Sequence, residues 1–245
     1  MLKYNTNFIN IKLFKETVYV YSVRRIIQKA IDKNLNLFHG VLLDLGCGEM
    51  PYRQYILDKN ISIIKYIGMD IDYSEYHQSI KPDLYWNGKD IPLKNNEVNT
   101  IIATELFEHI HNIENVLGEI FRVLSNEGLL FFTIPFVWPL HETPNDQYRY
   151  TPYSLKRIFE KSGFVDIKII PLGGYNASLA QMLCIWIYNY RNEDKSCFKK
   201  ILFEKIEKYI LYPIIKKLLK KDDNLNVNTY GENTMPTGFY GYAKK

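Results

Sequence analysis

The stretch that most constrains the fold is 41–48, with the sequence V-L-L-D-L-G-C-G. Its apolar residues suit a buried parallel strand, and Asp44 is the single acid among them. The strand ends in Gly46-Cys47-Gly48, where a glycine can adopt a positive φ and has no Cβ, so that the main chain can approach a ligand closely. A strand that runs into such a turn is typical of a nucleotide-type site at the carboxyl end of an α/β sheet.

The residues around this turn narrow the kind of ligand. In dinucleotide-binding turns a third glycine stands at the helix start, where a pyrophosphate rests on helix N–H groups. Pro51 follows Glu49 and Met50 at that place, which disfavours a pyrophosphate. An acid is nevertheless found at the expected spacing, because Y-I-G-M-D ends a second predicted strand at Asp70, where a carboxylate accepts from ribose hydroxyls. Both facts fit an adenosine without phosphates.

Four motifs extend this pattern between 41 and 172: D-L-G-C-G, Y-I-G-M-D, T-E-L-F-E-H and E-I-F-R-V-L-S-N-E-G. With them the chain resembles the class I S-adenosylmethionine-dependent methyltransferases, which implies S-adenosyl-L-methionine as the cofactor. Within the resemblance, Asp70 binds the ribose, and Asn87 stands where an aspartate usually accepts from adenine, a bond that an amide oxygen can also accept. The cofactor-binding residues predicted in this way are Asp44, Gly46, Cys47, Gly48, Asp70, Ile71, Asn87 and Gly88.

Alternating strands and helices predict an α/β fold with a doubly wound, mostly parallel sheet. The resemblance implies seven strands, with a helical insertion before the last. Predicted helices are 14–34, which would cover the sheet or the cofactor, 52–58, 115–124, closed by a turn at 125–128, and 154–162; predicted strands are 41–45, 61–70, one within 83–92, 97–103, 129–134, 164–170 and 238–243. The predicted domains are an N-terminal helical cap (1–40), a methyltransferase core (41–174 and 237–245) and a helical insertion (175–236).

The loop 135–153 is the predicted acceptor site. Its four prolines exclude regular structure, and it follows the carboxyl end of a strand beside the expected switch point. An imidazole there can take the proton of a hydroxyl acceptor at neutral pH, so His141 is the candidate catalytic base. Glu142 or Asp146 would orient it. Alternatively, His141 only bonds a backbone carbonyl.

Further residues are predicted to bind the acceptor. Tyr148 and Arg149 combine an aromatic face with a cation that can hold a polar, sugar-like ligand, although Arg149 can instead tie the loop to Asp146. Glu105 and His109 complete the predicted substrate-binding set. The segment 135–155 also resembles methyltransferases of bacterial surface-polysaccharide gene clusters. That resemblance implies O-methylation of a sugar, or of a group on a sugar, in a nucleotide- or lipid-linked precursor of a capsule or lipopolysaccharide.

A metal site is the rival interpretation of T-E-L-F-E-H. On a helix, Glu105, Glu108 and His109 share one face, and His141 can approach from the loop. Such a set suits Mg²⁺ or Mn²⁺ and is similar to the metal site of the small-RNA 3′-end methyltransferases. Because E-x-x-E-H also occurs in methyltransferases that use no metal, the sequence analysis predicts no metal. A metal-dependent RNA methyltransferase is the second hypothesis, and a non-catalytic binding partner with this fold is the third.

Size and composition favour a cytoplasmic enzyme. A chain of 245 residues that is 47% hydrophobic can bury a full core. The start has no apolar signal segment, no apolar run approaches the length of a membrane span, and three scattered cysteines give neither a disulfide framework nor zinc spacing. The net charge of +4 permits anionic sugar substrates or a membrane surface. Nucleic acid is not a predicted partner.

The insertion has a composition of its own. An aromatic helix is predicted at 179–190, and a lysine-rich helix at 198–221 is predicted to kink or restart at Pro213. In the second helix lysines alternate with aliphatic residues, which suits contact with the inner face of an anionic membrane, a homodimer face or a lid over the core. The residues 222–233 are predicted to be a solvated linker.

Overall fold

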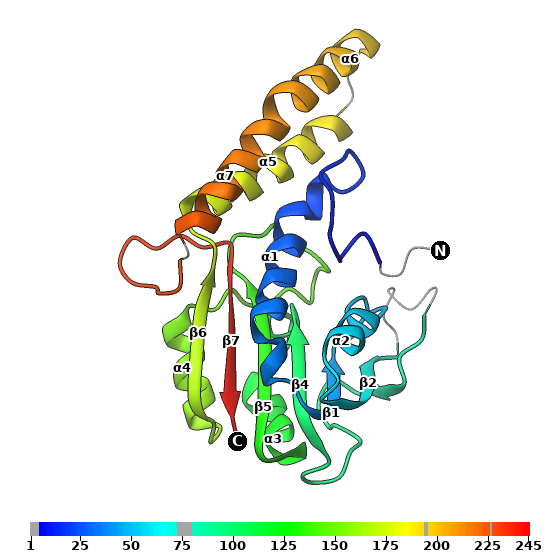
Figure 1. Cartoon of the computed structure of the whole chain (residues 1–245), viewed down its shortest axis with the longest axis vertical. Coiled ribbons are helices and arrows are strands. Elements are labelled where there is room, and N and C mark those ends of the chain that lie inside the picture. The colour runs from blue at the N-terminus through cyan, green and yellow to red at the C-terminus, as the bar shows by residue number, and fades with distance from the viewer. Residues whose placement is uncertain (1–4, 73–79, 194–195, 226) are drawn as a thin grey trace.

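The computed structural model describes residues 5–72, 80–193, 196–225 and 227–245. Its strands are β1 (Gly40–Leu45), β2 (Ile63–Ile71), β3 (Leu84–Trp86), β4 (Val98–Thr104), β5 (Leu124–Pro135), β6 (Val165–Leu172) and β7 (Gly238–Lys244). They form one sheet in the order β3-β2-β1-β4-β5-β7-β6 (Figure 1). Strand β7 is antiparallel to both of its neighbours, and the other neighbouring pairs are parallel. The predicted doubly wound, mostly parallel sheet of seven strands is therefore confirmed.

Capping side chains mark the start of two helices, α3 (Ile113–Val123) and α4 (Pro152–Lys161). Thr151 accepts a hydrogen bond from the Ser154 amide, and Pro152 occupies the first turn, so that α4 begins there. Asn112 caps α3 in the same way, through the amide of Asn115. The helices are α1 (Val18–Asn34), α2 (Arg53–Lys59), α3 (Ile113–Val123), α4 (Pro152–Lys161), α5 (Tyr175–Asn192), α6 (Cys197–Ile206) and α7 (Tyr212–Leu225), with short 3₁₀ turns η1 (Leu35–Leu37) and η2 (Phe107–His109) and a π-helical segment η3 (Glu207–Leu211).

The two faces of the sheet bury separate cores. Successive strand residues point to opposite faces. Leu42 and Ile102 pack into the core that is covered by α1, α2, α5 and α7. Leu43 and Ile101 pack into the core that is covered by α3 and α4. The result is a three-layer α/β/α architecture.

The switch point of the sheet lies at β1. This strand pairs with β2 on one side and with β4 on the other, so the chain crosses over in opposite directions from it. The glycine turn follows β1, and the segment that begins at Glu105 follows β4. The T-E-L-F-E-H motif and the glycine turn thus lie at the same edge of the sheet, where open α/β sheets bind ligands.

Two predictions about local structure were wrong. The segment 125–128 is not a turn that closes α3, because β5 already begins at Leu124, which pairs with Val98, and the register then shifts until Leu129 pairs with Thr100. Asp222 is not in a solvated linker. It lies in α7, is buried, and accepts hydrogen bonds from the amides of Gly174 (2.6 Å) and Ala177 (2.8 Å) at the start of α5. A long-range cap of this kind leaves no local signal in the sequence.

The helices between β6 and β7 form an arm that extends beyond the sheet (Figure 1). Pro213 lies in the first turn of α7, where the α-helix resumes after the π-helical segment, and a kink at this proline stays a prediction. A buried ion pair between Arg191 and Glu207 joins α5 to this segment, with 2.7 Å between Nε and Oε2. Among the described residues, no helix combines the length and the apolar composition that crossing a bilayer requires. The division of the chain into domains stays a prediction.

Candidate active site

The glycine turn is suspended from the end of β2. The amides of Gly46 and Cys47 both donate to the carbonyl of Met69, at 2.9 and 3.1 Å. Gly46 has a φ of 73° and Gly48 a φ of 50°, in the left-handed region that favours glycine. A Cβ on Gly46 would meet Leu106 at 2.8 Å, whereas one on Gly48 would find no heavy atom within 4 Å. The main chain at Gly48 is therefore open to a ligand.

Asp70 lies against this turn, as the sequence predicts. One carboxylate oxygen accepts from the Gly48 amide at 2.7 Å and the other from the Ile71 amide at 2.7 Å. These two bonds fix the carboxylate beside the turn. The ribose contact of Asp70 stays a prediction, and the geometry is suitable for it.

Asp44 provides a second observation that fits an adenosyl amino acid. It is buried, and one oxygen accepts from the hydroxyl of Tyr66, while the other has no hydrogen-bond partner in the structure. Burial raises the pKa of Asp44 to about 7, although the bond from Tyr66 opposes the shift. A buried carboxylate oxygen without a partner would gain one from the ammonium group of a bound amino acid, and this contact of Asp44 stays a prediction. The bond from Tyr66 to Asp44 was not predicted, because a tyrosine in a buried strand is typical of core packing.

Asn87 is placed differently from the expectation. Its side-chain oxygen accepts from the amides of Lys89 (2.8 Å) and Asp90 (2.7 Å), and its nitrogen donates to the Asp90 carboxylate (3.0 Å). The oxygen that would accept from adenine is thus already engaged in a local turn. Gly88 follows with a φ of 78° and open space where a Cβ would stand. The adenine contact of Asn87 stays a prediction.

Glu105 does not share a helical face with Glu108 and His109, so that prediction was wrong. The residue precedes the 3₁₀ turn η2 and has a φ of 51°. Its side chain accepts from the Thr133 hydroxyl at 2.8 Å. Burial raises the pKa of Glu105 to about 7. The sequence spacing suggested a regular helix, but the chain is still leaving β4 at this residue.

The loop 136–151 is fastened to η2. The amides of Gln147 and Tyr148 donate to the Glu108 carbonyl at 2.8 and 3.2 Å, and the Tyr148 hydroxyl donates to the His111 carbonyl at 3.3 Å. On the opposite side, Trp138 packs against Tyr19 of α1, with 5.1 Å between the ring centroids. The loop is therefore held between α1 and the segment that follows β4.

His141 is oriented by Asp146, one of the two partners that the sequence left open. Its Nδ1 lies 3.1 Å from an Asp146 carboxylate oxygen, which also accepts from the His141 amide at 3.1 Å. Arg149 binds both oxygens of the same carboxylate, at 2.5 and 2.7 Å, and its guanidinium holds the pKa of Asp146 at about 2. Asp146 is therefore ionised throughout the neutral range beside the imidazole.

Arg149 also donates to the carbonyls of Trp138 and Pro139, at 3.4 and 3.3 Å. Two roles were considered for Arg149, acceptor binding and a bond that ties the loop to Asp146. The structure contains the second. The Tyr148 ring packs against that of Tyr150, with 5.2 Å between centroids. Contact of Arg149 and Tyr148 with an acceptor stays a prediction.

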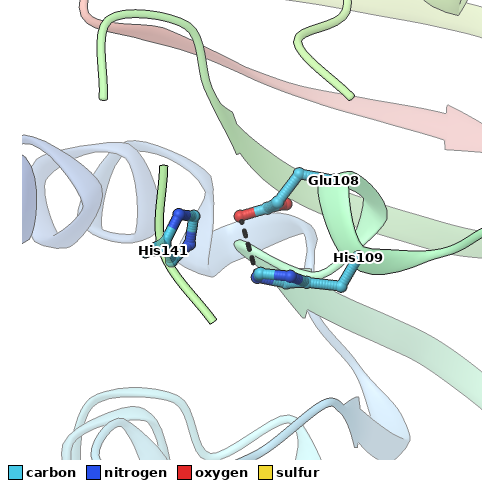
Figure 2. A group of neighbouring side chains, drawn as sticks. All are labelled: Glu108, His109 and His141. Carbon is cyan, nitrogen blue, oxygen red and sulfur yellow. Dashed lines mark ion pairs between the residues drawn. The ribbon is translucent and has the colours of Figure 1, made fainter. Parts of the chain in front are cut away.

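Three side chains meet where the loop crosses η2: Glu108, His109 and His141 (Figure 2). One potential ligand atom from each lies within 4.8 Å of the others. Glu108 is fully buried, and neither of its carboxylate oxygens has a hydrogen-bond partner in the structure. We refer to these residues as the Glu108–His109–His141 cluster.

The strand order with an antiparallel β7, together with an open glycine turn bound to an acid at the end of β2, defines a class I methyltransferase fold and site. The sequence matches the family described as methyltransferase domain over residues 19–169. The chain belongs to this family and is an S-adenosylmethionine-dependent methyltransferase, as the sequence analysis predicted.

Solved structures agree on the fold. A methyltransferase from Archaeoglobus fulgidus is 16% identical, with a TM-score of 0.54 and coverage of 90% of this chain and 94% of that chain. A putative sarcosine dimethylglycine methyltransferase from Galdieria sulphuraria is 15% identical, with a TM-score of 0.57 and coverage of 95% and 91%. Phosphoethanolamine N-methyltransferase 2 of Haemonchus contortus, solved with S-adenosyl-L-methionine, is 13% identical, with a TM-score of 0.54 and coverage of 100% and 60%. No curated protein sequence matches the chain.

Proposed function

We propose that this enzyme O-methylates a hydroxyl group on a carbohydrate or sugar-linked precursor of a bacterial surface polysaccharide, in the cytoplasm. The observation that carries the proposal is the 3.1 Å contact between His141 Nδ1 and the ionised Asp146, on a loop at the ligand-binding edge of the sheet. A hydroxyl acceptor needs a base, whereas an amine acceptor can react as a free base. The resemblance of the loop to methyltransferases of polysaccharide gene clusters supports a sugar as the acceptor.

One set of residues would bind the cofactor, and His141 would transfer the proton of the acceptor. The bound cofactor supplies a methyl group on a sulfonium. Gly48 and Asp70 would hold its adenosine, and Asp44 its ammonium group. His141, with Nδ1–H donating to Asp146, would accept the acceptor's proton at Nε2, and the ionised carboxylate would stabilise the resulting imidazolium. Because methyl transfer is an in-line displacement, most of the remaining work is alignment of the acceptor oxygen by the loop.

The acceptor class can be tested directly with the full-length protein and S-adenosylmethionine labelled in the methyl group. The assay would offer nucleotide-linked sugars, lipid-linked sugars, small amines and short RNAs. We expect base-stable label in a sugar fraction, as an ether would give. Label confined to amines or to RNA would overturn the proposal, and label in RNA would favour the second hypothesis.

The arm suits contact with an anionic membrane, where a lipid-linked acceptor would lie. It exposes both cationic and large apolar side chains, which together favour the interface of an anionic bilayer. The exposed lysines are Lys199, Lys200, Lys205, Lys208, Lys216, Lys217, Lys220 and Lys221, and the exposed apolar residues include Phe198, Ile201, Leu202, Tyr209, Ile210 and Ile214. We propose that this surface binds the inner face of the membrane.

Charge reversal at Lys199 and Lys208 (both to Glu) should weaken co-sedimentation with phosphatidylglycerol vesicles at least about tenfold, because each lysine near such a surface contributes ~1 kcal/mol. The same reversal at the exposed Lys65 and Lys94, outside the arm, should have little effect. Equal loss in both double variants would contradict a specific surface. Self-association detected by light scattering, without vesicle binding, would instead assign the arm to a dimer interface.

A further inference from the structure

We propose that the Glu108–His109–His141 cluster binds one divalent transition-metal cation, such as Mn²⁺ or Zn²⁺. This departs from the absence of a metal that the sequence analysis predicts. The binding itself is independent of the acceptor, whereas a catalytic role for the cation rests on the proposed methylation of a hydroxyl and would replace His141 as the base. Figure 2 shows the Glu108 carboxylate directed between the two imidazoles.

Glu108 is the strongest reason for a cation. Its side chain is 1% exposed, and its oxygens lack any hydrogen-bond donor in the structure. Nε2 of His109 is 3.7 Å from Oε1, an ion-pair contact that is beyond hydrogen-bond range (Figure 2). Burying an unpaired carboxylate is costly, so native structures supply such groups with hydrogen bonds, a counter-charge or a metal. A cation between the three side chains would provide the missing partner.

Both histidines are oriented as metal ligands usually are. Nδ1 of His109 lies 3.3 Å from the Asn145 carbonyl, and Nδ1 of His141 lies 3.1 Å from Asp146. When Nδ1–H donates to such an oxygen, the tautomer is fixed and the Nε2 lone pair is left for a metal. A further carboxylate, that of Glu142, lies 3.9 Å from His109 Nε2.

The donor set determines the kind of cation. Imidazole nitrogens favour first-row transition metals, whereas Mg²⁺ and Ca²⁺ prefer oxygen ligands alone. Ligand atoms of a tetrahedral site are ~3.5 Å apart, so the cluster, now within 4.8 Å, needs only side-chain adjustments to close on an ion. Three protein ligands leave a coordination position for an acceptor hydroxyl.

The cation would change the part that His141 plays. With Nε2 on the metal, this residue is a ligand and no longer the base. A cation held by Glu108, His109 and His141 would lower the pKa of an acceptor hydroxyl bound to it, so that the hydroxyl would give its proton to solvent water more readily before methyl transfer. Asp146 would then orient the His141 ring as a metal ligand.

The test is binding of Co²⁺ and Mn²⁺ to the full-length protein after chelator treatment and dialysis. Visible absorption reports Co²⁺, and electron paramagnetic resonance reports free Mn²⁺. We expect one ion per chain, a cation-dependent rise in Tm, and at least ~100-fold weaker binding in His109→Ala and in the near-isosteric Glu108→Gln. His111→Ala, an exposed histidine two residues beyond His109, should bind as the unaltered protein does.

Two results would overturn the metal site. One is that the unaltered protein binds neither Co²⁺ nor Mn²⁺. The other is that Glu108→Gln and His109→Ala bind these ions as tightly as the unaltered protein, while both variants show cooperative unfolding. The methyl-transfer assay, run with EDTA and with each metal, separates this inference from the proposed function. Sugar methylation by a protein that binds no metal removes the metal site alone. Metal binding without sugar methylation under any condition removes the proposed acceptor alone.

Discussion

Replacing Asp70 with alanine should weaken S-adenosylmethionine binding by about 100-fold or more while the protein stays folded. Hydrogen bonds to a charged group contribute ~1.5–3 kcal/mol each, and two ribose hydroxyls would lose theirs. The variant also removes the acceptor that holds the Gly48 amide at 2.7 Å, so the turn would lose one of its three anchoring hydrogen bonds. Both changes would weaken binding of the adenosine part of the cofactor.

Calorimetric titration of the cofactor measures this effect. Asp58→Ala removes an exposed carboxylate from α2 and should leave the affinity unchanged. Asp70→Asn can still accept from the Gly48 amide but lacks the charge, so an intermediate loss would separate the ribose contact from support of the turn. If Asp70→Ala binds the cofactor as tightly as the unaltered protein, the assignment of this carboxylate to the ribose is wrong.

Replacing His141 with alanine should lower turnover by about 100-fold or more and leave cofactor affinity nearly intact. General base catalysis contributes effects of about this size. The side chain is bonded to Asp146 in the loop, whereas the predicted cofactor residues belong to β1, β2 and the turns that follow β1 and β3, so the two functions are separable. The measurement is a single-turnover rate at saturating cofactor, alongside a cofactor titration.

A matched control is His39→Ala. His39 is exposed, and its ring contacts the Leu37 carbonyl at 3.2 Å, as the His141 ring contacts the Pro139 carbonyl at 3.3 Å. The control variant should keep full turnover. Unchanged turnover in His141→Ala would remove this residue from the mechanism. His109→Ala extends the comparison. With a direct base at His141, this variant should lose acceptor affinity and keep its turnover at saturating acceptor, whereas a metal shared by the two histidines makes both variants slow.

Local signals were sufficient for the first two strands and the cofactor turn. The apolar run at 41–45, the glycines that follow it and the spacing to Asp70 specify a strand, a turn and an acid because each depends on neighbouring residues alone. Asn87 shows the limit of this reasoning. Residue type identified a hydrogen-bond acceptor, but the amides that already use its oxygen, Lys89 and Asp90, depend on the turn geometry.

The acceptor side depended more on tertiary contacts. The sequence proposed Glu142 or Asp146 as the partner of His141, and only the fold brings Asp146 to 3.1 Å. The positive φ of Glu105 breaks the spacing argument for a shared helical face. The unpaired state of Glu108 is a property of what surrounds a buried side chain, which no pattern along the chain records.

Strand β7 separates β5 from β6 in the sheet but follows both of them in the chain, with the whole arm in between. Until it arrives, β6 has no ladder partner among the described strands, and β5 presents an open apolar edge. The sheet is therefore completed late, by a contact of high sequence separation, which is slow to form. During synthesis, β5 and β6 would therefore be exposed with unpaired edges before β7 is made. Such edges are prone to aggregation, so we expect chaperones to bind the chain at this stage.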